Sequence, residues 1–195
     1  MSLAQLADLA QILAEVFLEP DAELQEGLEA LLQAAPGPLL SEPLARMVAQ
    51  GLPAEDQPVE YARLFLHPKD TEAIHLFESV QARGHHLAPE LLASLKAIHD
   101  AAEIAIQEDL GIPPDHLGLE LACLSYLLSQ VIEADPDERL RFVELAQRLL
   151  REHLHPLLTA VAARLPRASA HPYYQAASDL AGALCSESGK ALAEI

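Results

Sequence analysis

The stretch IPPDHLGLELACLSYLLSQVIE, residues 112–133, joins a helix start to a long apolar run. Two prolines stop the preceding segment, and Asp115 stands where a helix cap belongs. The pattern predicts a helix to about Glu133, with the Asp115 carboxylate accepting a hydrogen bond from a backbone N–H of the first turn. His116 is not explained by helix formation, since leucine or alanine would serve a helix better. It therefore remains open whether Asp115 and His116 only start a helix or form a working site.

Helical periodicity also dominates the rest of the chain, and no run alternates with the period of a strand. Ser2 and Gln5 predict a capping box at the first helix, and Ser41 is predicted to cap the third. Asp135 and Pro136 predict another start, while Pro156 predicts a kink near residue 153. The expected helices cover about 2–18, 22–35, 41–50, 58–67, 89–110, 116–133, 136–164 and 173–187.

These elements predict an all-α protein, a single-domain bundle of roughly eight to ten helices over residues 1–195. Residues 68–88 are less regular and are expected to form a mobile loop with about one helical turn. A hinge is expected near 134–137. Either segment would allow helices to swap between copies, so the expected state is a monomer or a helix-swapped dimer.

The composition describes a folded and strongly acidic chain. Hydrophobic residues make up 51%, and 12 Lys and Arg stand against 30 Asp and Glu, giving a formal charge of −18. Such a surface repels nucleic acid and favours a basic partner, although the charge also serves solubility. We expect a cytoplasmic protein without stable membrane insertion. The two cysteines lie in helical patterns, and the sequence shows neither a signal peptide nor an apolar run long enough to span a membrane.

The histidines raise the possibility of an enzyme. His99–Asp100 matches the centre of HD-type metal phosphohydrolases, which need a further upstream His and a downstream Asp. Two residues are a short match, and a solvated helix face is the favoured interpretation. No HExxH motif, nucleophile elbow or phosphate-binding glycine loop is present. We therefore expect no catalytic residue, no metal site and no cofactor.

Four motifs in order resemble the TorD-like redox-enzyme maturation chaperones, the TorD/DmsD/NarJ-like family. The first is YARLF, residues 61–65, followed by FESVQ, residues 77–81. The second is the Pro-x-Asp-His segment PPDHLGLEL, residues 113–121. QRLLREHLHPLL and HPYYQAASDLAGAL then match the closing helices. Phe77 and Gln81 depart from the family's frequent tryptophan and tyrosine.

The resemblance implies an all-helical cytoplasmic chaperone without chemistry of its own. Such a chaperone binds the twin-arginine signal peptide, or an N-terminal segment, of the apo-form catalytic subunit of a molybdenum-cofactor oxidoreductase. It holds that subunit back from export until the cofactor is inserted and the subunit has folded. The acidic composition fits a receptor for a basic and apolar peptide.

Carried onto this sequence, the resemblance implies a peptide-binding site. Asp115 and Glu78 are expected to face the peptide's arginines, and His116 to hydrogen-bond backbone or tune Asp115. Tyr61, Phe65 and Phe77 are expected on the apolar side, although core packing explains Tyr61 and Phe65 equally well. The full expected set is Asp115, His116, Pro114, Glu78, Ser79, Phe77, Tyr61, Phe65 and Glu120. The alternatives are the HD-like phosphohydrolase and a helical adaptor for some other basic partner.

Overall fold

The computed structural model describes residues 1–18, 24–34, 37–51, 53, 56–66, 74–84, 88–105, 111–168 and 170–195. These residues form an all-α fold, as predicted, and they contain no strand. The helices in the first half are α1 (Leu3–Leu18), α2 (Leu24–Gln33), α3 (Pro38–Gln50), α4 (Gln57–Tyr61), η1 (Ala62–Leu66), α5 (Glu78–Arg83) and α6 (Pro89–Ala101). Those in the second half are α7 (Leu117–Glu133), α8 (Pro136–Leu149), η3 (Leu150–Leu154), α9 (His155–Arg164) and α10 (Pro172–Ala193).

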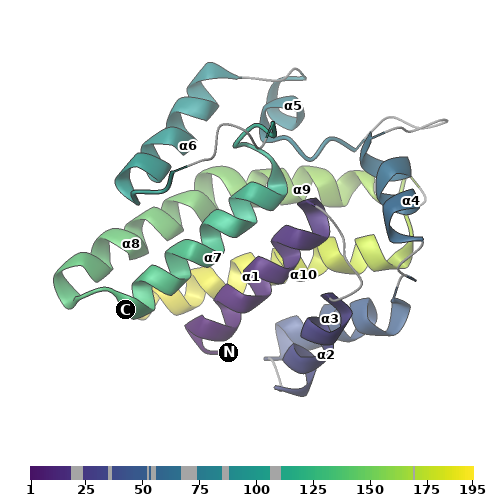
Figure 1. The fold of residues 1–195 in the computed structure, drawn as a ribbon, viewed down its shortest axis with the longest axis horizontal. Helices are drawn as coiled ribbons and strands as arrows, with labels where there is room; N and C mark the ends of the chain where they lie inside the picture. Colours follow the sequence, from purple (N-terminus) through teal and green to yellow (C-terminus); the bar gives the residue numbers. More distant parts are fainter. Residues whose placement is uncertain are drawn as a thin grey trace.

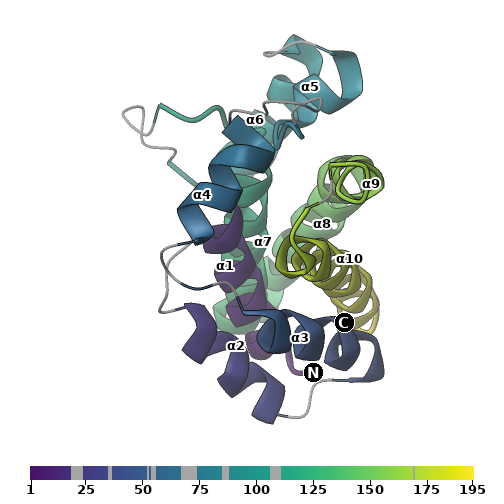
Figure 2. The same ribbon diagram turned by 90° about the vertical axis from the view of Figure 1, so that its right-hand side faces the viewer.

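The centre of the fold is a layer of long helices. Helix α1 packs along α7, and α10 contacts α1, α3 and α9 (Figure 1). Turned by 90°, the ribbon shows α2 and α3 at one end of this layer and α4, α5 and α6 at the other (Figure 2). The buried core consists mainly of leucine and alanine from these helices. None of the helices in the described residues is long and apolar enough to cross a membrane.

Close packing of α1 on α7 depends on Gly118. A Cβ at this position would lie 2.4 Å from Leu18 Cγ and 2.9 Å from the backbone oxygen of Ala14. A backbone atom cannot move aside as a flexible side chain can, so only glycine allows this approach of the two helices. The first turn of α7 is therefore fixed against the N-terminal helix.

Several helix starts follow the predicted local rules. The backbone N–H of Ser2 donates to Gln5 Oε1 at 3.0 Å and the Gln5 N–H donates to Ser2 Oγ at 3.3 Å, which confirms the capping box. Asp135 stands at the N-cap of α8, with Pro136 in its first turn. The predicted kink before Pro156 is a π-helical turn, η3, because proline has no N–H for the regular helical hydrogen bond.

Three predicted boundaries were wrong. Ser41 lies inside α3, which starts at Pro38 after Gly37, because a proline in the first turn is already preorganised. The helix predicted over 89–110 ends at Ala101, where Glu103 adopts a left-handed φ of 59° and the Ile104 N–H donates to the His99 carbonyl. The last helix extends to Ala193, beyond the predicted 187.

The expected loop at 68–88 is described only in part. Residues 68–73 and 85–87 lie outside the described residues, as do 106–110 of the predicted long helix. Residues 74–84 include the short helix α5, and Ile74 and Leu76 are buried in the core. This part of the segment is thus packed into the fold.

Candidate functional site

Two of the motifs meet in space. Phe77 and His116 form an isolated antiparallel bridge between extended segments. The Glu78 N–H donates to the Asp115 carbonyl at 2.8 Å, and the Leu117 N–H donates to the Leu76 carbonyl at 2.7 Å. The start of α5 is thereby fastened to the start of α7. We call Phe77, Glu78, Ser79, Asp115, His116 and Glu120 the junction cluster.

Asp115 does not cap α7, so the predicted N-cap was wrong. Its side chain is fully buried, and Oδ2 accepts a hydrogen bond from the Ser79 N–H at 2.9 Å. Ser79 lies in the first turn of α5, where backbone N–H groups lack partners within the helix. The carboxylate therefore caps a helix distant in sequence, because the bridge places it there rather than over its own helix.

His116 is the N-cap of α7. Its Nδ1 accepts a hydrogen bond from the Gly118 N–H at 3.2 Å, so the ring proton belongs on Nε2. Its ring meets the Phe77 ring edge to face, with 4.9 Å between centroids. Burial lowers the pKa of His116 to about 4, against the opposing effect of the Asp115 charge. A neutral imidazole suits this role, since protonation of Nδ1 would remove the acceptor.

Glu78 joins a polar chain that crosses the fold. Its Oε2 lies 2.8 Å from His153 Nδ1, and both side chains are buried. His153 Nε2 lies 3.0 Å from Ser94 Oγ, which also accepts from the Arg148 guanidinium at 3.1 Å. If the Ser94 hydroxyl donates to Nε2, then His153 Nδ1–H donates to Glu78 and every contact is satisfied. The chain links α5 through η3 to α6 and α8.

The pairing of His153 with Glu78 was not foreseen from the sequence. The two partners are 75 residues apart, so no local spacing rule connects them. The kink that Pro156 predicts near residue 153 is the one sequence signal at this position. The structure has a π-helical turn there, and such turns are frequent at functional sites.

Glu120 is a buried carboxyl group beside two others. It is 1% exposed, and neither of its oxygens has a hydrogen-bond partner among the described residues. Burial, together with the charges of Glu78 and Asp115, raises the pKa of Glu120 well above its ordinary value. Burial and the neighbouring charges therefore favour the neutral form of Glu120 over the carboxylate, and the neutral form adds no charge to the junction cluster.

Tyr61 and Phe65 belong to an aromatic cluster in the core. The Phe65 ring lies 6.4 Å from Phe17 and 5.4 Å from Tyr174, measured between centroids. The Tyr61 hydroxyl donates to the Phe17 carbonyl at 2.8 Å. Core packing, one of the two interpretations considered for these residues, is what the structure shows for Phe65. Pro114 is half-buried immediately before the junction cluster.

His99 and Asp100 do not form a common site. The His99 side chain is buried, with Nδ1 lacking a partner among the described residues, so the predicted solvated helix face was wrong for this residue. Asp100 is exposed and paired with Lys96 at 2.6 Å. Among the residues that the structure describes, no group of three or more His, Cys, Asp or Glu is placed to hold a metal ion. The geometry gives the HD-like alternative no support.

A family model described as "Nitrate reductase delta subunit" matches residues 17–163. The chain belongs to this family, the NarJ/TorD-like chaperones, as the sequence motifs predicted. It is thus a redox-enzyme maturation chaperone, of a family that is not catalytic. A search of curated proteins finds no match.

Proposed function

We propose that this chaperone binds the twin-arginine signal peptide, or an N-terminal segment, of a nitrate-reductase-type molybdenum-cofactor subunit. By holding that segment in the cytoplasm, it delays export until the cofactor is inserted and the subunit has folded. The observation that carries the proposal is the direct contact between two family motifs, Phe77–Ser79 and Asp115–His116, through a backbone bridge and a hydrogen bond. The charge of −18 supports a basic partner.

The junction cluster acts as the support of the binding surface in this conformation. Asp115 is 0% exposed and Glu78 is 5% exposed, so neither carboxylate reaches solvent. Direct contact with an arginine requires the Leu76–Ser79 segment to separate from Asp115–Leu117. The affinity of the peptide is then coupled to the stability of this junction, since opening the junction costs part of the binding energy.

Calorimetric titration with synthetic N-terminal peptides of the molybdoenzymes from the same organism tests the proposal. We expect one peptide to bind with a stoichiometry near one, and its Lys-Lys version to bind more weakly, because two lysines cannot form the paired hydrogen bonds of arginine. Asp115→Asn keeps an acceptor for the Ser79 N–H while it removes the charge. A loss of affinity in this variant would assign the charge a role in binding.

The adaptor alternative predicts a different outcome. A general adaptor for basic partners would bind Arg-Arg and Lys-Lys peptides equally, with an affinity that follows net charge alone. Equal affinity across the panel at matched charge would reject recognition of the twin-arginine sequence. Absence of binding to every peptide and to the cofactor-free subunits would reject the proposed function as a whole.

A further inference from the structure

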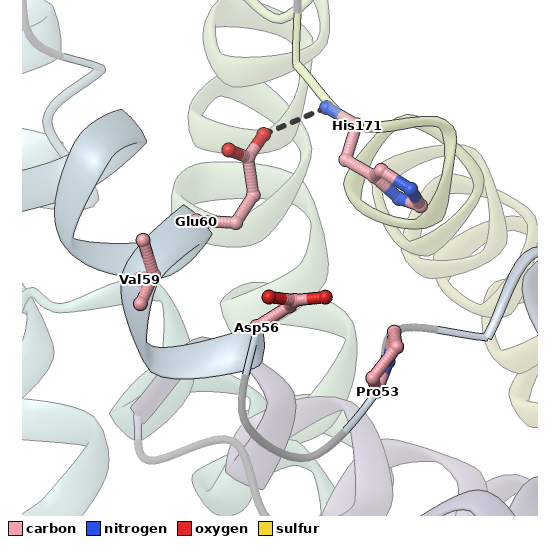
Figure 3. Close-up of a pocket in the computed structure, with 5 residues that line it drawn as sticks. All are labelled: Pro53, Asp56, Val59, Glu60 and His171. Atoms are coloured by element: carbon pink, nitrogen blue, oxygen red, sulfur yellow. Dashed lines mark hydrogen bonds between the residues drawn. The ribbon is translucent and has the colours of Figure 1, made fainter.

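A pocket opens beside α4, away from the residues of the junction cluster. It is a cavity of about 250 Å³ lined by Pro53, Asp56, Val59, Glu60 and His171 (Figure 3). Its residues come from the start of α4, from the segment before that helix and from the N-cap of α10. Two carboxylates and two apolar side chains thus face the same space.

Asp56 stands at the N-cap of α4 without acting as a side-chain cap. An aspartate at this position usually accepts a hydrogen bond from the first turn. Here no such bond is made, and the carboxylate points into the space between Glu60, Pro53 and His171 (Figure 3). Among the residues that the structure describes, this carboxylate has no hydrogen-bond or ion-pair partner. Its charge is available to a ligand.

Glu60 is a fixed wall of the pocket. It accepts hydrogen bonds from Arg63 Nε at 2.6 Å and from the His171 N–H at 2.8 Å. Burial opposes its ionisation, but these hydrogen bonds outweigh burial and lower the pKa of Glu60. Arg63 also donates to the Ala168 carbonyl at 3.2 Å, which holds the pair in place. The Arg63 guanidinium therefore compensates the negative charge of Glu60, whereas the charge of Asp56 has no such compensation.

The remaining walls suit a flat cation with apolar faces. Val59 is 67% exposed, and it lines the pocket together with Pro53. Outside the pocket lining, the Tyr174 hydroxyl is buried and has no partner among the described residues. Burial is the main cause that raises the pKa of Tyr174, with smaller effects of nearby charges that include Glu60.

From these observations we propose that the pocket receives an arginine side chain of the partner peptide. The guanidinium would bind the Asp56 carboxylate and lie near Glu60, with its stem against Val59 and Pro53. Arginine is favoured over lysine because its planar group donates two parallel hydrogen bonds to one carboxylate and is more weakly hydrated. This inference rests on the proposed function for the identity of the peptide, but the pocket and its chemistry do not depend on it.

The test combines a substitution in the protein with one in the peptide. The probe is a synthetic peptide with two adjacent arginines followed by about ten apolar residues, the order found in export signals. Each arginine is replaced in turn by citrulline, which keeps the shape and removes the charge. Asp56→Asn is the protein variant. The matched control is Asp137→Asn in the first turn of α8, a helix that lies away from α4 in both views (Figures 1 and 2).

We expect Asp56→Asn to lower the affinity of the protein for the arginine peptide roughly three- to tenfold. This is the range for one carboxylate–guanidinium pair at a partly exposed site. One of the two citrulline peptides should be insensitive to Asp56→Asn, because its missing charge is the one that Asp56 contacts. Asp137→Asn should leave the affinity within about twofold. Two results would overturn the proposed arginine pocket. One is an equal loss of affinity in Asp56→Asn and Asp137→Asn, and the other is an additive effect of Asp56→Asn with each of the two citrulline substitutions.

A second arm separates this inference from the proposed function. N-acetyl-arginine amide is titrated into the wild-type protein, and backbone amide shifts of Val59, Glu60 and His171 are followed by NMR. Saturable shifts at these residues, absent in Asp56→Asn, support the pocket even if no long peptide binds. Absence of shifts at high millimolar probe overturns the pocket, while binding of the long peptide in the same protein would leave the proposed function standing.

Discussion

Replacement of Asp115 by alanine tests how the two motifs are held together. The substitution removes the acceptor of the Ser79 N–H, which lies in the interior at a helix end. A buried donor without a partner costs about 1–3 kcal/mol, and loss of a helix cap about 0.5–2 kcal/mol. Since both descriptions concern the same hydrogen bond, the two ranges do not add, and we expect a decrease of about 1–3 kcal/mol in the free energy of unfolding.

The matched variant is Asp115→Asn, which keeps an oxygen acceptor and removes the negative charge near Glu78 and Glu120. We expect it to lose less than about 1 kcal/mol, because the hydrogen bond persists and carboxylate repulsion is relieved. Urea unfolding followed by circular dichroism measures both variants. The alanine variant should also melt about 2–12 °C lower. If alanine and asparagine destabilise equally, the cap of α5 by Asp115 does not hold the junction.

Three further predictions concern packing and protonation. Gly118→Ala should lower the free energy of unfolding by about 2–3 kcal/mol, because its Cβ meets Leu18 and backbone, whereas Gly182→Ala, with open space in the middle of α10, should raise it by about 0.5–1 kcal/mol in the same urea assay. Glu120 has a raised pKa, so its neutral form is the one that the fold favours. Its stabilising contribution is complete below the ordinary value of 4.5 and is lost as the pH rises through the folded-state pKa. The free energy of unfolding of Glu120→Gln should therefore rise relative to that of the wild type as the pH increases from 4 to 8. A difference that does not change with pH would refute a raised pKa of Glu120. For His116 the sign is opposite, since a pKa lowered from 6.5 to about 4 gives stability that is present above pH 6.5 and lost as the pH falls through about 4. His116→Asn keeps a capping acceptor and should flatten the acid side of the stability profile, and NMR of the wild-type imidazole should show no titration near 6.5.

The parts of the fold that obey local rules were predictable from the sequence. The capping box at Ser2, the start at Pro136 and the interruption before Pro156 each depend on a few neighbouring residues. The end of α6 was missed because Glu103 takes a left-handed conformation that usually selects glycine or asparagine. No residue pattern marked that turn.

The sequence predicted which residues belong to the site better than it predicted what their side chains do. The resemblance selected Asp115, His116 and Glu78, but the residues alone could not show that Asp115 caps a helix 36 positions earlier. The same holds for the pair of Glu78 with His153, since tertiary contacts of buried polar groups are not encoded in local spacing. Burial of these side chains could not be predicted from local spacing either, and it is the reason why we propose that they support the peptide-binding surface instead of forming its exposed contacts.

We propose above all that the chain captures the N-terminal segment of a cofactor-free redox-enzyme subunit. The most direct measurement is the affinity of the purified chaperone for the cofactor-free catalytic subunit of the nitrate-reductase-type enzyme from the same organism, with and without that segment. We predict saturable binding of the intact cofactor-free subunit and a loss of at least tenfold in affinity when the segment is removed, a difference of about 1.4 kcal/mol. Equal affinity for the intact and truncated subunits, or binding of neither, would contradict capture of the N-terminal segment by the chaperone.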